Sequence, residues 1–247
     1  MSLNGRVALV TGAAKRVGRA IALELASAGC DVAVHFRQSE QEARVVVDEI
    51  RASGRRAVAI RADLSDAAQW RTLVEQTIAS LGRLDILINN ASAFATTTPD
   101  TLADFSVSLW HDMLQTNLIA PTGLCHHAAP YLKKSGRGKI INLCDISADR
   151  PWPSHLAYCS SKAGLVALTK ALARSLAPDV QVNGVSPGVA VFPEDYSEAV
   201  RKQLVDRIPL QREGTPEEVA QLVRYLCHEG HYITGQIIPI DGGRSIV

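Results

Sequence analysis

The stretch RVALVTGAAKRVGRAIALELASAGCDVAVHF, residues 6–36, joins two short apolar runs through a longer amphipathic segment. The two runs are rich in β-branched residues and almost continuously apolar, which is typical of parallel strands covered on both faces. Between them Val17, Ile21 and Leu25 recur at helical spacing. The stretch therefore predicts a strand, a crossover helix and a second, parallel strand.

The same alternation continues to the end of the chain. Further strands are predicted at 56–62, 84–90, 139–144, 180–186 and 236–241, and further helices at 39–53, 66–81, 102–133, 155–177 and 216–228. Strands that alternate with helices form right-handed crossovers and a doubly wound sheet. We find no internal repeat or linker, so residues 1–247 are predicted to form one Rossmann-type α/β domain with about seven parallel strands flanked by helices.

Composition narrows the class of protein. Hydrophobic residues make up 47% of the 247, enough for a large core, and the formal net charge of +1 comes without a basic block. Binding to nucleic acid or to an anionic membrane through bulk charge is therefore disfavoured. The five scattered cysteines are odd in number and lack C-x-x-C spacing, which predicts reduced thiols rather than disulfides or a zinc site.

The apolar segments are all short. The start, MSLNGRVALVTGAAKR, lacks the apolar core of a signal peptide, and no apolar run reaches the roughly 18 residues that span a bilayer. The histidines and carboxylates show no metal-ligand spacing such as H-E-x-x-H. We therefore expect a soluble, cytoplasmic protein with no metal site.

A glycine loop, TGAAKRVGRA, follows the first strand. Gly12 and Gly18 frame a turn into a helix whose free N–H groups can bind a pyrophosphate. Lys15 and Arg16 lie at the helix start, where the dipole disfavours cations, and an anionic ligand would compensate them. The loop predicts a dinucleotide site, although an ordinary strand-to-helix turn is the alternative.

The end of the second strand indicates which dinucleotide. Selection of NAD usually places a carboxylate there to bind the ribose hydroxyls, whereas this chain has His35, Arg37 and Ser39. These residues can donate to a 2′-phosphate, which a carboxylate would repel. NADPH is therefore favoured over NADH, the alternative being a solvated, mildly basic loop.

The stretch NLCDISADRPWPSHLAYCSSK, residues 142–162, contains a candidate catalytic set. Tyr158 and Lys162 are one helical turn apart and project from the same face. A free tyrosine has a pKa of about 10, and a nearby ammonium would lower the pKa toward the range useful for general acid catalysis. Asp145 stands thirteen residues before the tyrosine.

Together, five ordered motifs resemble the short-chain dehydrogenase/reductase family over essentially the whole chain: TGAAKRVG, LINNAS, the acid-Tyr-Lys set, NGVSPG and YITGQIIPIDGG. Most members of that family carry serine at the position of Asp145 and glycine at that of Arg16. These two departures, with NNAS in place of the commoner NNAG, resemble the pteridine reductase branch.

The resemblance implies a set of cofactor contacts in addition to those at the second strand. They are Gly12, Arg16, Val17, Gly18, Asp63, Leu64, Asn90, Ala91, Ser92, Tyr158, Lys162, Pro187, Gly188 and Val189. By this resemblance, Asp63 and the backbone of Leu64 would bind the adenine, and Arg16 would bridge the cofactor phosphates and the substrate. The alternative for Asp63 is a cap on the helix that opens near Ser65.

The substrate would contact Arg16, Ser92, Phe94, Asp145 and Tyr158. Phe94 would stack a planar pterin against the nicotinamide, its alternative being a core aromatic. Asn117 would help to hold the active-site lysine and a water chain, its alternative being a buried, satisfied amide. Ser147 could supply a hydroxyl in place of Asp145, but it lies two residues too close to Tyr158 for the family pattern.

The resemblance thus implies an NADPH-dependent pteridine reductase that acts on dihydropterins, with dihydrofolate and oxidised pterins as further candidates and Tyr158 as proton donor. A substrate lid is expected around 190–210, and a homotetramer through helices 102–133 and 155–177. One alternative is a carbonyl or ketoacyl reductase of the same family. Another is a non-catalytic NADPH-binding redox sensor, against which the intact tyrosine and lysine argue.

Overall fold

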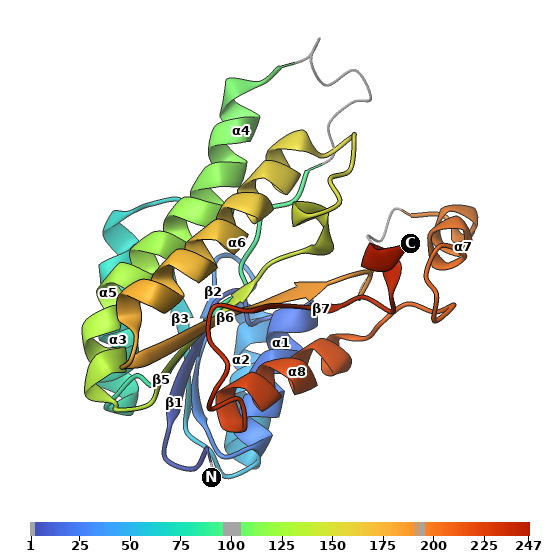
Figure 1. Cartoon of the computed structure of the whole chain (residues 1–247). Helices are drawn as coiled ribbons and strands as arrows, with labels where there is room; N and C mark the ends of the chain where they lie inside the picture. The colour runs from blue at the N-terminus through green and yellow to red at the C-terminus, as the bar shows by residue number, and fades with distance from the viewer. Residues whose placement is uncertain (1–2, 96–104, 191, 193–195) are drawn as a thin grey trace.

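The computed structural model describes residues 3–95, 105–190, 192 and 196–247. Within them the strands form one sheet of seven in the order β3-β2-β1-β4-β5-β6-β7, and every neighbouring pair is parallel (Figure 1). The strands are β1 Val7–Val10, β2 Asp31–Phe36, β3 Ala57–Arg61, β4 Ile86–Asn89, β5 Gly138–Leu143, β6 Val180–Pro187 and β7 Ile237–Ile240. The predicted doubly wound sheet is confirmed.

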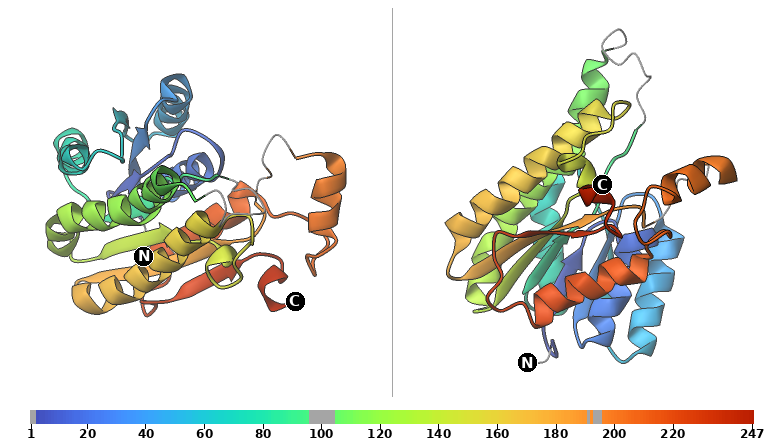
Figure 2. Two further views of the ribbon diagram at one scale, coloured as in Figure 1. Left: turned by 90° about the horizontal axis from the view of Figure 1, so that it is seen from above. Right: turned by 45° about the vertical axis from the view of Figure 1, so that its right-hand side comes forward.

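Helices cover both faces of the sheet (Figures 1 and 2). One face packs against α1 (Arg16–Ser27), α2 (Glu40–Ala52) and α8 (Pro216–His228), and the other against α3 (Ala68–Leu81), α5 (Ala120–Lys134) and α6 (Leu156–Leu176). Because side chains alternate along a strand, Ile86 and Ile88 of β4 enter the first core and Leu87 enters the second. Burial on both faces explains the unbroken apolar runs in the sequence. The cysteines are all buried and free, as predicted.

The helix predicted at 102–133 begins later than expected. It is built from α4 (Val107–Leu114), a π-helical turn (Gln115–Ile119) and α5. Phe105 and Ser106 are not helical, because Ser106 is extended and its Oγ accepts a hydrogen bond from Leu109 N (3.3 Å) as the N-cap. Residues 102–104 lie outside the described residues. A π-turn inserts an extra residue per turn and often marks a functional site, and here it carries Asn117.

The predicted lid around 190–210 contains α7 (Glu198–Val205), which stands away from the two helical layers (Figure 2). Residues 191 and 193–195 of this segment lie outside the described residues. Phe192 is buried, and the Arg201 guanidinium lies over its ring, 5.6 Å from the centroid. Both α4 and α7 lie at the end of the sheet opposite the N-terminus (Figure 1). In the part of the chain that the structure describes, no helix combines the length and the apolarity needed to cross a membrane.

Candidate active site

A cavity of about 850 Å³ lies at the carboxyl ends of the strands. Ligands of doubly wound sheets bind at this edge, where the strand order reverses, here between β1 and β4. Most of the predicted site residues line it: Gly12, Arg16, Val17, Gly18, His35, Arg37, Asp63, Leu64, Asn90, Ala91, Ser92, Phe94, Asp145, Tyr158, Pro187, Gly188 and Val189. Ser39, Asn117 and Lys162 lie outside this lining.

The glycine loop is held closely against the end of β4. A Cβ on Gly18 would lie 2.2 Å from Gly12 O, so only glycine fits this approach of backbone to backbone. The Asn90 side-chain amide donates to Thr11 O (2.8 Å), and Thr11 Oγ1 accepts from the backbone N–H groups of Asn90 (2.9 Å) and Ala91 (3.0 Å). These contacts leave the start of α1 facing the cavity, as a pyrophosphate site requires.

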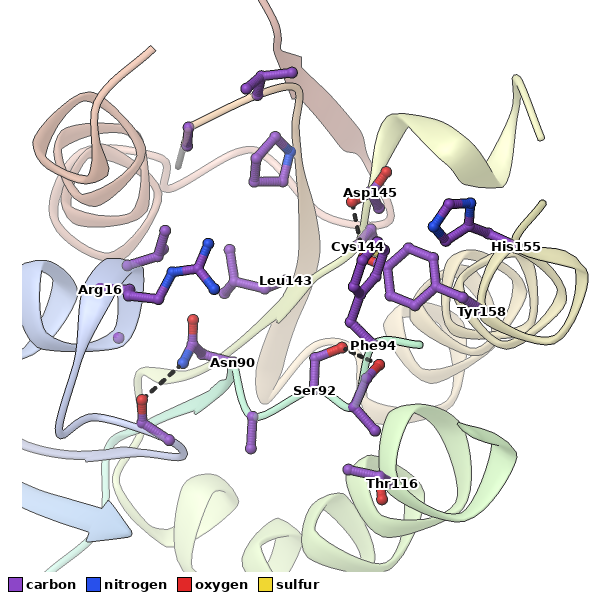
Figure 3. Close-up of a pocket in the computed structure, with 18 of the residues that line it drawn as sticks. Arg16, Asn90, Ser92, Phe94, Thr116, Leu143, Cys144, Asp145, His155 and Tyr158 are labelled. Carbon is purple, nitrogen blue, oxygen red and sulfur yellow. Dashed lines mark hydrogen bonds between the residues drawn. The ribbon is translucent and has the colours of Figure 1, made fainter. Parts of the chain in front are cut away.

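Arg16 begins α1 with a φ of 52°. A non-glycine residue in this left-handed region stores roughly 1–3 kcal/mol of strain, which clusters at functional sites. Its side chain reaches into the cavity from the α1 side, across from Asp145 and Tyr158 (Figure 3). Arg16 therefore combines a strained backbone with a position in the cavity that agrees with its expected contacts to the cofactor phosphates and to the substrate.

His35 lines the cavity but cannot fill its predicted role as a donor to a 2′-phosphate. Its Nδ1 accepts from Gly12 N (3.0 Å), and its Nε2, which must then carry the proton, donates to Ala62 O (3.1 Å). The side chain is only 2% exposed, and burial lowers the pKa of His35 to about 4. His35 is thus a neutral brace that fixes the glycine loop.

The other two residues predicted at this end differ. Arg37 is exposed and lines the cavity, as a phosphate contact would. Ser39 does not line it and is the N-cap position of α2, so the structure gives no support for its cofactor role. Lys15 lines the cavity too and pairs with Glu42 at 2.7 Å.

Asp63 stabilises the turn before α3 by accepting hydrogen bonds from Ser65, close to the capping role named as its alternative. Its Oδ1 accepts from Ser65 Oγ (2.7 Å) and Ser65 N (3.0 Å), and these bonds hold the pKa of Asp63 below its usual value. It nevertheless lines the cavity together with Leu64. The turn therefore presents Asp63 as an ionised carboxylate at the cavity edge.

Asp145 and Tyr158 form the central contact of the site. Tyr158 Oη donates to Asp145 Oδ2 (2.8 Å), while Asp145 Oδ1 accepts from Ser147 N (2.8 Å) (Figure 3). Ser147 itself is fully buried and does not line the cavity, so the aspartate is the group that faces a ligand. Burial, and next the Asp145 carboxylate, raise the pKa of Tyr158 well above its ordinary value.

The predicted lowering of the Tyr158 pKa by Lys162 is therefore wrong for this arrangement. Lys162 is buried, its Nζ donates to Leu143 O (2.8 Å), and it lies 5.7 Å from the centroid of the Tyr158 ring. Burial lowers the pKa of Lys162 in turn. The ammonium is near, but burial and the bonded carboxylate dominate the titration of the tyrosine.

Asn117 is a buried, satisfied amide that organises the substrate end of the β4 loop. Its Oδ1 accepts from Ser92 Oγ (3.1 Å) and Ala93 N (2.8 Å), and its Nδ2 donates to Ala93 O (2.9 Å) and Ser161 Oγ (3.0 Å). Its capacity is used by these bonds, whereas Lys162 bonds to Leu143. The Asn117 side chain thus links the loop to α6, and its help in holding Lys162 and a water chain stays a prediction.

Aromatic rings line the same end of the cavity. Phe94 is 46% exposed, so it is not a core aromatic. It stacks on His155 (4.9 Å between centroids, 26° between planes) and meets Tyr158 edge-on (4.9 Å, 84°). Trp152 lies parallel to Tyr158 (6.3 Å, 16°). The result is an aromatic wall beside the Asp145–Tyr158 pair, suited to a flat ligand.

Several cavity residues were not predicted. They are Thr116, Trp152, His155, Phe192, Tyr196, Arg207 and Arg244. His155 could have been found, because it precedes Tyr158 by three residues and so shares its helix face. Thr116 lies on the π-helical turn and Arg244 on the short C-terminal helical turn, and the remaining residues come from a loop or the lid. None of them has a regular spacing from Tyr158 that would signal a shared site. Among the described residues, no group of three or more His, Cys, Asp or Glu could hold a metal ion.

The buried neutral His35 predicts a pH effect on stability. Unfolded His35 binds a proton below about pH 6.5, whereas folded His35 stays neutral down to about 4. The unfolded state then binds more protons in this window, so stability falls as pH falls through it. We expect the stability advantage of wild type over His35→Asn to shrink by about 2 kcal/mol from pH 7.5 to pH 5 in urea unfolding. A constant difference would exclude this role.

The strain at Arg16 predicts different effects of two substitutions. Arg16→Ala removes the guanidinium and keeps the strained positive φ, whereas Arg16→Gly removes the guanidinium and also the strain, because glycine adopts a positive φ at little cost. We expect the glycine variant to be the more stable by about 1 kcal/mol in thermal or urea unfolding. Both should bind NADPH about tenfold more weakly by fluorescence titration, because each loses a charge-assisted phosphate contact. Wild-type affinity in both variants would remove Arg16 from the cofactor site.

Comparison with known proteins agrees with this geometry. A family model described as enoyl-(acyl carrier protein) reductase matches residues 12–245. The 3-oxoacyl-(acyl-carrier-protein) reductase FabG of Staphylococcus aureus is 36% identical over 240 residues, covering 96% of each chain.

Solved structures match over nearly the full length. FolM alternative dihydrofolate reductase 1 from Brucella canis, complexed with NADP, is 33% identical with a TM-score of 0.91 over 98% of this chain and 94% of its own. A blue fluorescent protein from a metagenomic library, in complex with NADPH, is also 33% identical with a TM-score of 0.91 and 99% coverage of both chains. With its doubly wound sheet, glycine loop and Tyr158–Lys162 pair, the chain belongs to the short-chain dehydrogenase/reductase family of oxidoreductases.

Proposed function

We propose that this protein is an NADPH-dependent reductase of dihydropterins, with dihydrofolate within its substrate class. The observation that carries the proposal is the hydrogen bond from Tyr158 to Asp145 at the cavity wall. A ketone offers the site only an acceptor oxygen, which a carboxylate cannot complement. A pterin ring carries N–H and amino donors, which a carboxylate accepts well. Asp145 therefore suits a nitrogen heterocycle better than a simple carbonyl.

NADPH as the predicted cofactor is confirmed by the solved relatives, one with NADPH and one with NADP. The residues of this chain fit it. Gly12 and Gly18 leave a cradle that a Cβ would fill, and Lys15, Arg16 and Arg37 supply positive charge along the cavity. These residues would hold the phosphates, and Pro187, Gly188 and Val189 would lie over the nicotinamide. When bound, NADPH supplies the hydride.

Tyr158 would supply the proton to a ring nitrogen of the substrate. Its raised pKa keeps the phenol protonated at neutral pH. The bond to Asp145 positions the phenol oxygen, and the O–H would turn from the carboxylate to the ring nitrogen for the transfer. The nearby Lys162 ammonium stabilises the phenolate that proton transfer leaves behind. Asp145 would orient Tyr158 and accept a hydrogen bond from the pterin. In the reduction of a fully oxidised pterin it would help to deliver the second proton.

The aromatic wall supports a planar substrate. Phe94 exposes nearly half of its surface at the cavity while its other contacts, with His155 and Tyr158, hold it in place. A pterin can stack on such a ring with an offset, which adds roughly 0.5–1.5 kcal/mol to its burial. An acyl chain gains less from a flat wall. Ser92, held by Asn117, lies at the same end and could bond the ring edge.

A 3-oxoacyl or other carbonyl reductase is the second candidate, and the sequence relatives favour it. The Staphylococcus aureus protein named above carries that activity in its name, whereas a dihydrofolate reductase is found among the structural relatives. Tyr158 and Lys162 could equally protonate the oxygen of a ketone. The non-catalytic sensor has no observation in its favour, and the homotetramer stays a prediction. Exposed apolar residues on α4 and α5, such as Val107 and Tyr131, would be available to such an interface.

Removal of the phenol tests the proton donor. Tyr158→Phe should lower turnover of dihydrobiopterin by about 100-fold or more, because the general acid is lost. Binding of NADPH, followed by fluorescence, should change little, since the ring and its packing remain. Turnover near the wild-type rate in this variant would exclude Tyr158 as the donor.

Asp145 separates the two candidate functions. With dihydrobiopterin, dihydrofolate and a panel of simple ketones, NADPH oxidation by wild type should be fastest on the dihydropterins. Asp145→Ser should reduce kcat/KM for the dihydropterin by about 10-fold to 100-fold and leave ketone turnover intact, because serine is the residue common in the family. Asp145→Asn is the matched control, because it keeps the shape of the aspartate side chain and removes its negative charge. Turnover by wild type on ketones alone would establish the second candidate instead.

A further inference from the structure

The lid end of the cavity holds two arginines that the proposed chemistry does not use. Arg207 follows α7, and Arg244 begins the short helical turn Arg244–Ile246 near the C-terminus. Both line the same cavity as Asp145 and Tyr158. The segments that carry them lie together, since Leu210 N donates to Gly242 O (3.1 Å), and Figure 1 shows the C-terminus beside the α7 region.

Arg244 lacks a partner for part of its guanidinium. Its Nη1 is buried and makes no hydrogen bond, and neither Arg207 nor Arg244 forms an ion pair within the described residues. A buried donor without a partner is costly unless a ligand satisfies it. Arg244 therefore carries an unsatisfied donor, and Arg207, whose side chain is exposed, lines the same cavity.

The charges around Arg244 leave an excess of positive charge. Arg207 and Arg150 are the neighbouring cations, and Asp145 and Asp241 are the neighbouring carboxylates. The oxygens of Asp145 accept from Tyr158 and Ser147 N, and those of Asp241 accept from Gly243 N and Ser245 N. Both carboxylates are thus engaged by other donors. An anion brought by the ligand would complete this cluster.

That anion is not the cofactor's. The phosphates would be bound at the β1–α1 loop and the end of β2, by Lys15, Arg16 and Arg37. Arg207 and Arg244 come instead from the lid and the C-terminal segment, and Arg244 interacts with Asp145 on the substrate side. The second arginine group therefore faces the part of a substrate that extends away from the reacting ring.

We propose that Arg207 and Arg244 form a subsite for a carboxylate or phosphate on the tail of the substrate. The identity of the reacting ring rests on the proposed function, and with it the subsite favours dihydrofolate, whose glutamyl tail carries two carboxylates, over dihydrobiopterin, whose tail is neutral. A guanidinium group can donate two parallel hydrogen bonds, which match the planar geometry of a carboxylate.

The test compares charged and neutral members of two substrate pairs. Dihydrofolate is paired with dihydrobiopterin, and acetoacetyl-coenzyme A, which carries phosphates, with the neutral acetoacetyl thioester of N-acetylcysteamine. Arg244→Gln and Arg207→Gln should each lower kcat/KM for the charged member about 10-fold to 100-fold, mostly through KM, since a bond to a charged group is lost. The neutral member should change by less than about twofold. Arg244→Lys should recover part of the loss.

Arg212→Gln is the matched control, because Arg212 is an exposed arginine close to the lid that pairs with Glu218 (2.6 Å) and does not line the cavity.

Equal losses on both members of the pair that is turned over would overturn the subsite. If only the ketoacyl pair is reduced, the proposed function fails. The subsite is then tested by comparing the losses on acetoacetyl-coenzyme A and on its neutral analogue. If neither is reduced, calorimetry with the NADP-loaded protein decides it: wild type should bind folate more tightly than biopterin, and Arg244→Gln should abolish the preference. No preference in wild type would overturn the proposal.

Discussion

The close contact between the β1–α1 turn and the end of β4 fixes the geometry of everything else in the site. Gly18 allows the turn to approach its own backbone at a distance that no side chain permits. The Asn90 side-chain amide, just after β4, donates to the turn, and the Thr11 hydroxyl at the end of β1 accepts from the Asn90 backbone N–H. His35 holds the turn from β2. Because three strands pin this one turn, the start of α1 is preorganised toward the cavity, and little ordering remains to be done when an anion binds.

The features predicted correctly from the sequence are those that depend on local geometry. The alternation of apolar runs predicted the sheet, because strands buried on both faces must be apolar throughout. The spacing of Asp145, Tyr158 and Lys162 placed them at one site, since a strand end and one helix face carry them. Patterns of this kind depend on local geometry, which the sequence records directly. The start of α4 was less predictable, because the extended N-cap Ser106 places the first helical residue at Val107, after the start predicted at residue 102.

The roles of single polar residues were harder to predict. His35 and Asn117 are the right residue types for a ligand contact, yet each spends its hydrogen-bonding capacity on the protein itself. The Tyr158 pKa depends on how deeply the phenol is buried and on which neighbour it bonds, neither of which follows from Tyr-x-x-x-Lys spacing. Arg207 and Arg244 stand 37 positions apart and meet only because the lid folds back on the C-terminal segment. Such contacts between distant segments leave no periodic trace in one sequence.

The charges of the cavity suggest how two ligands could share it. Positive groups lie at the glycine loop and β2, a carboxylate lies at the reacting centre, and positive groups return at the lid. A cofactor with phosphates fits the first region, and a ring with N–H donors fits the second. A ligand that places its own anion against the lid would then be held at both ends, with its ring fixed between Phe94 and the hydride donor. Reversing it would bring its anion against Asp145 and its ring donors against the arginines, so the order of charges would itself enforce a single orientation.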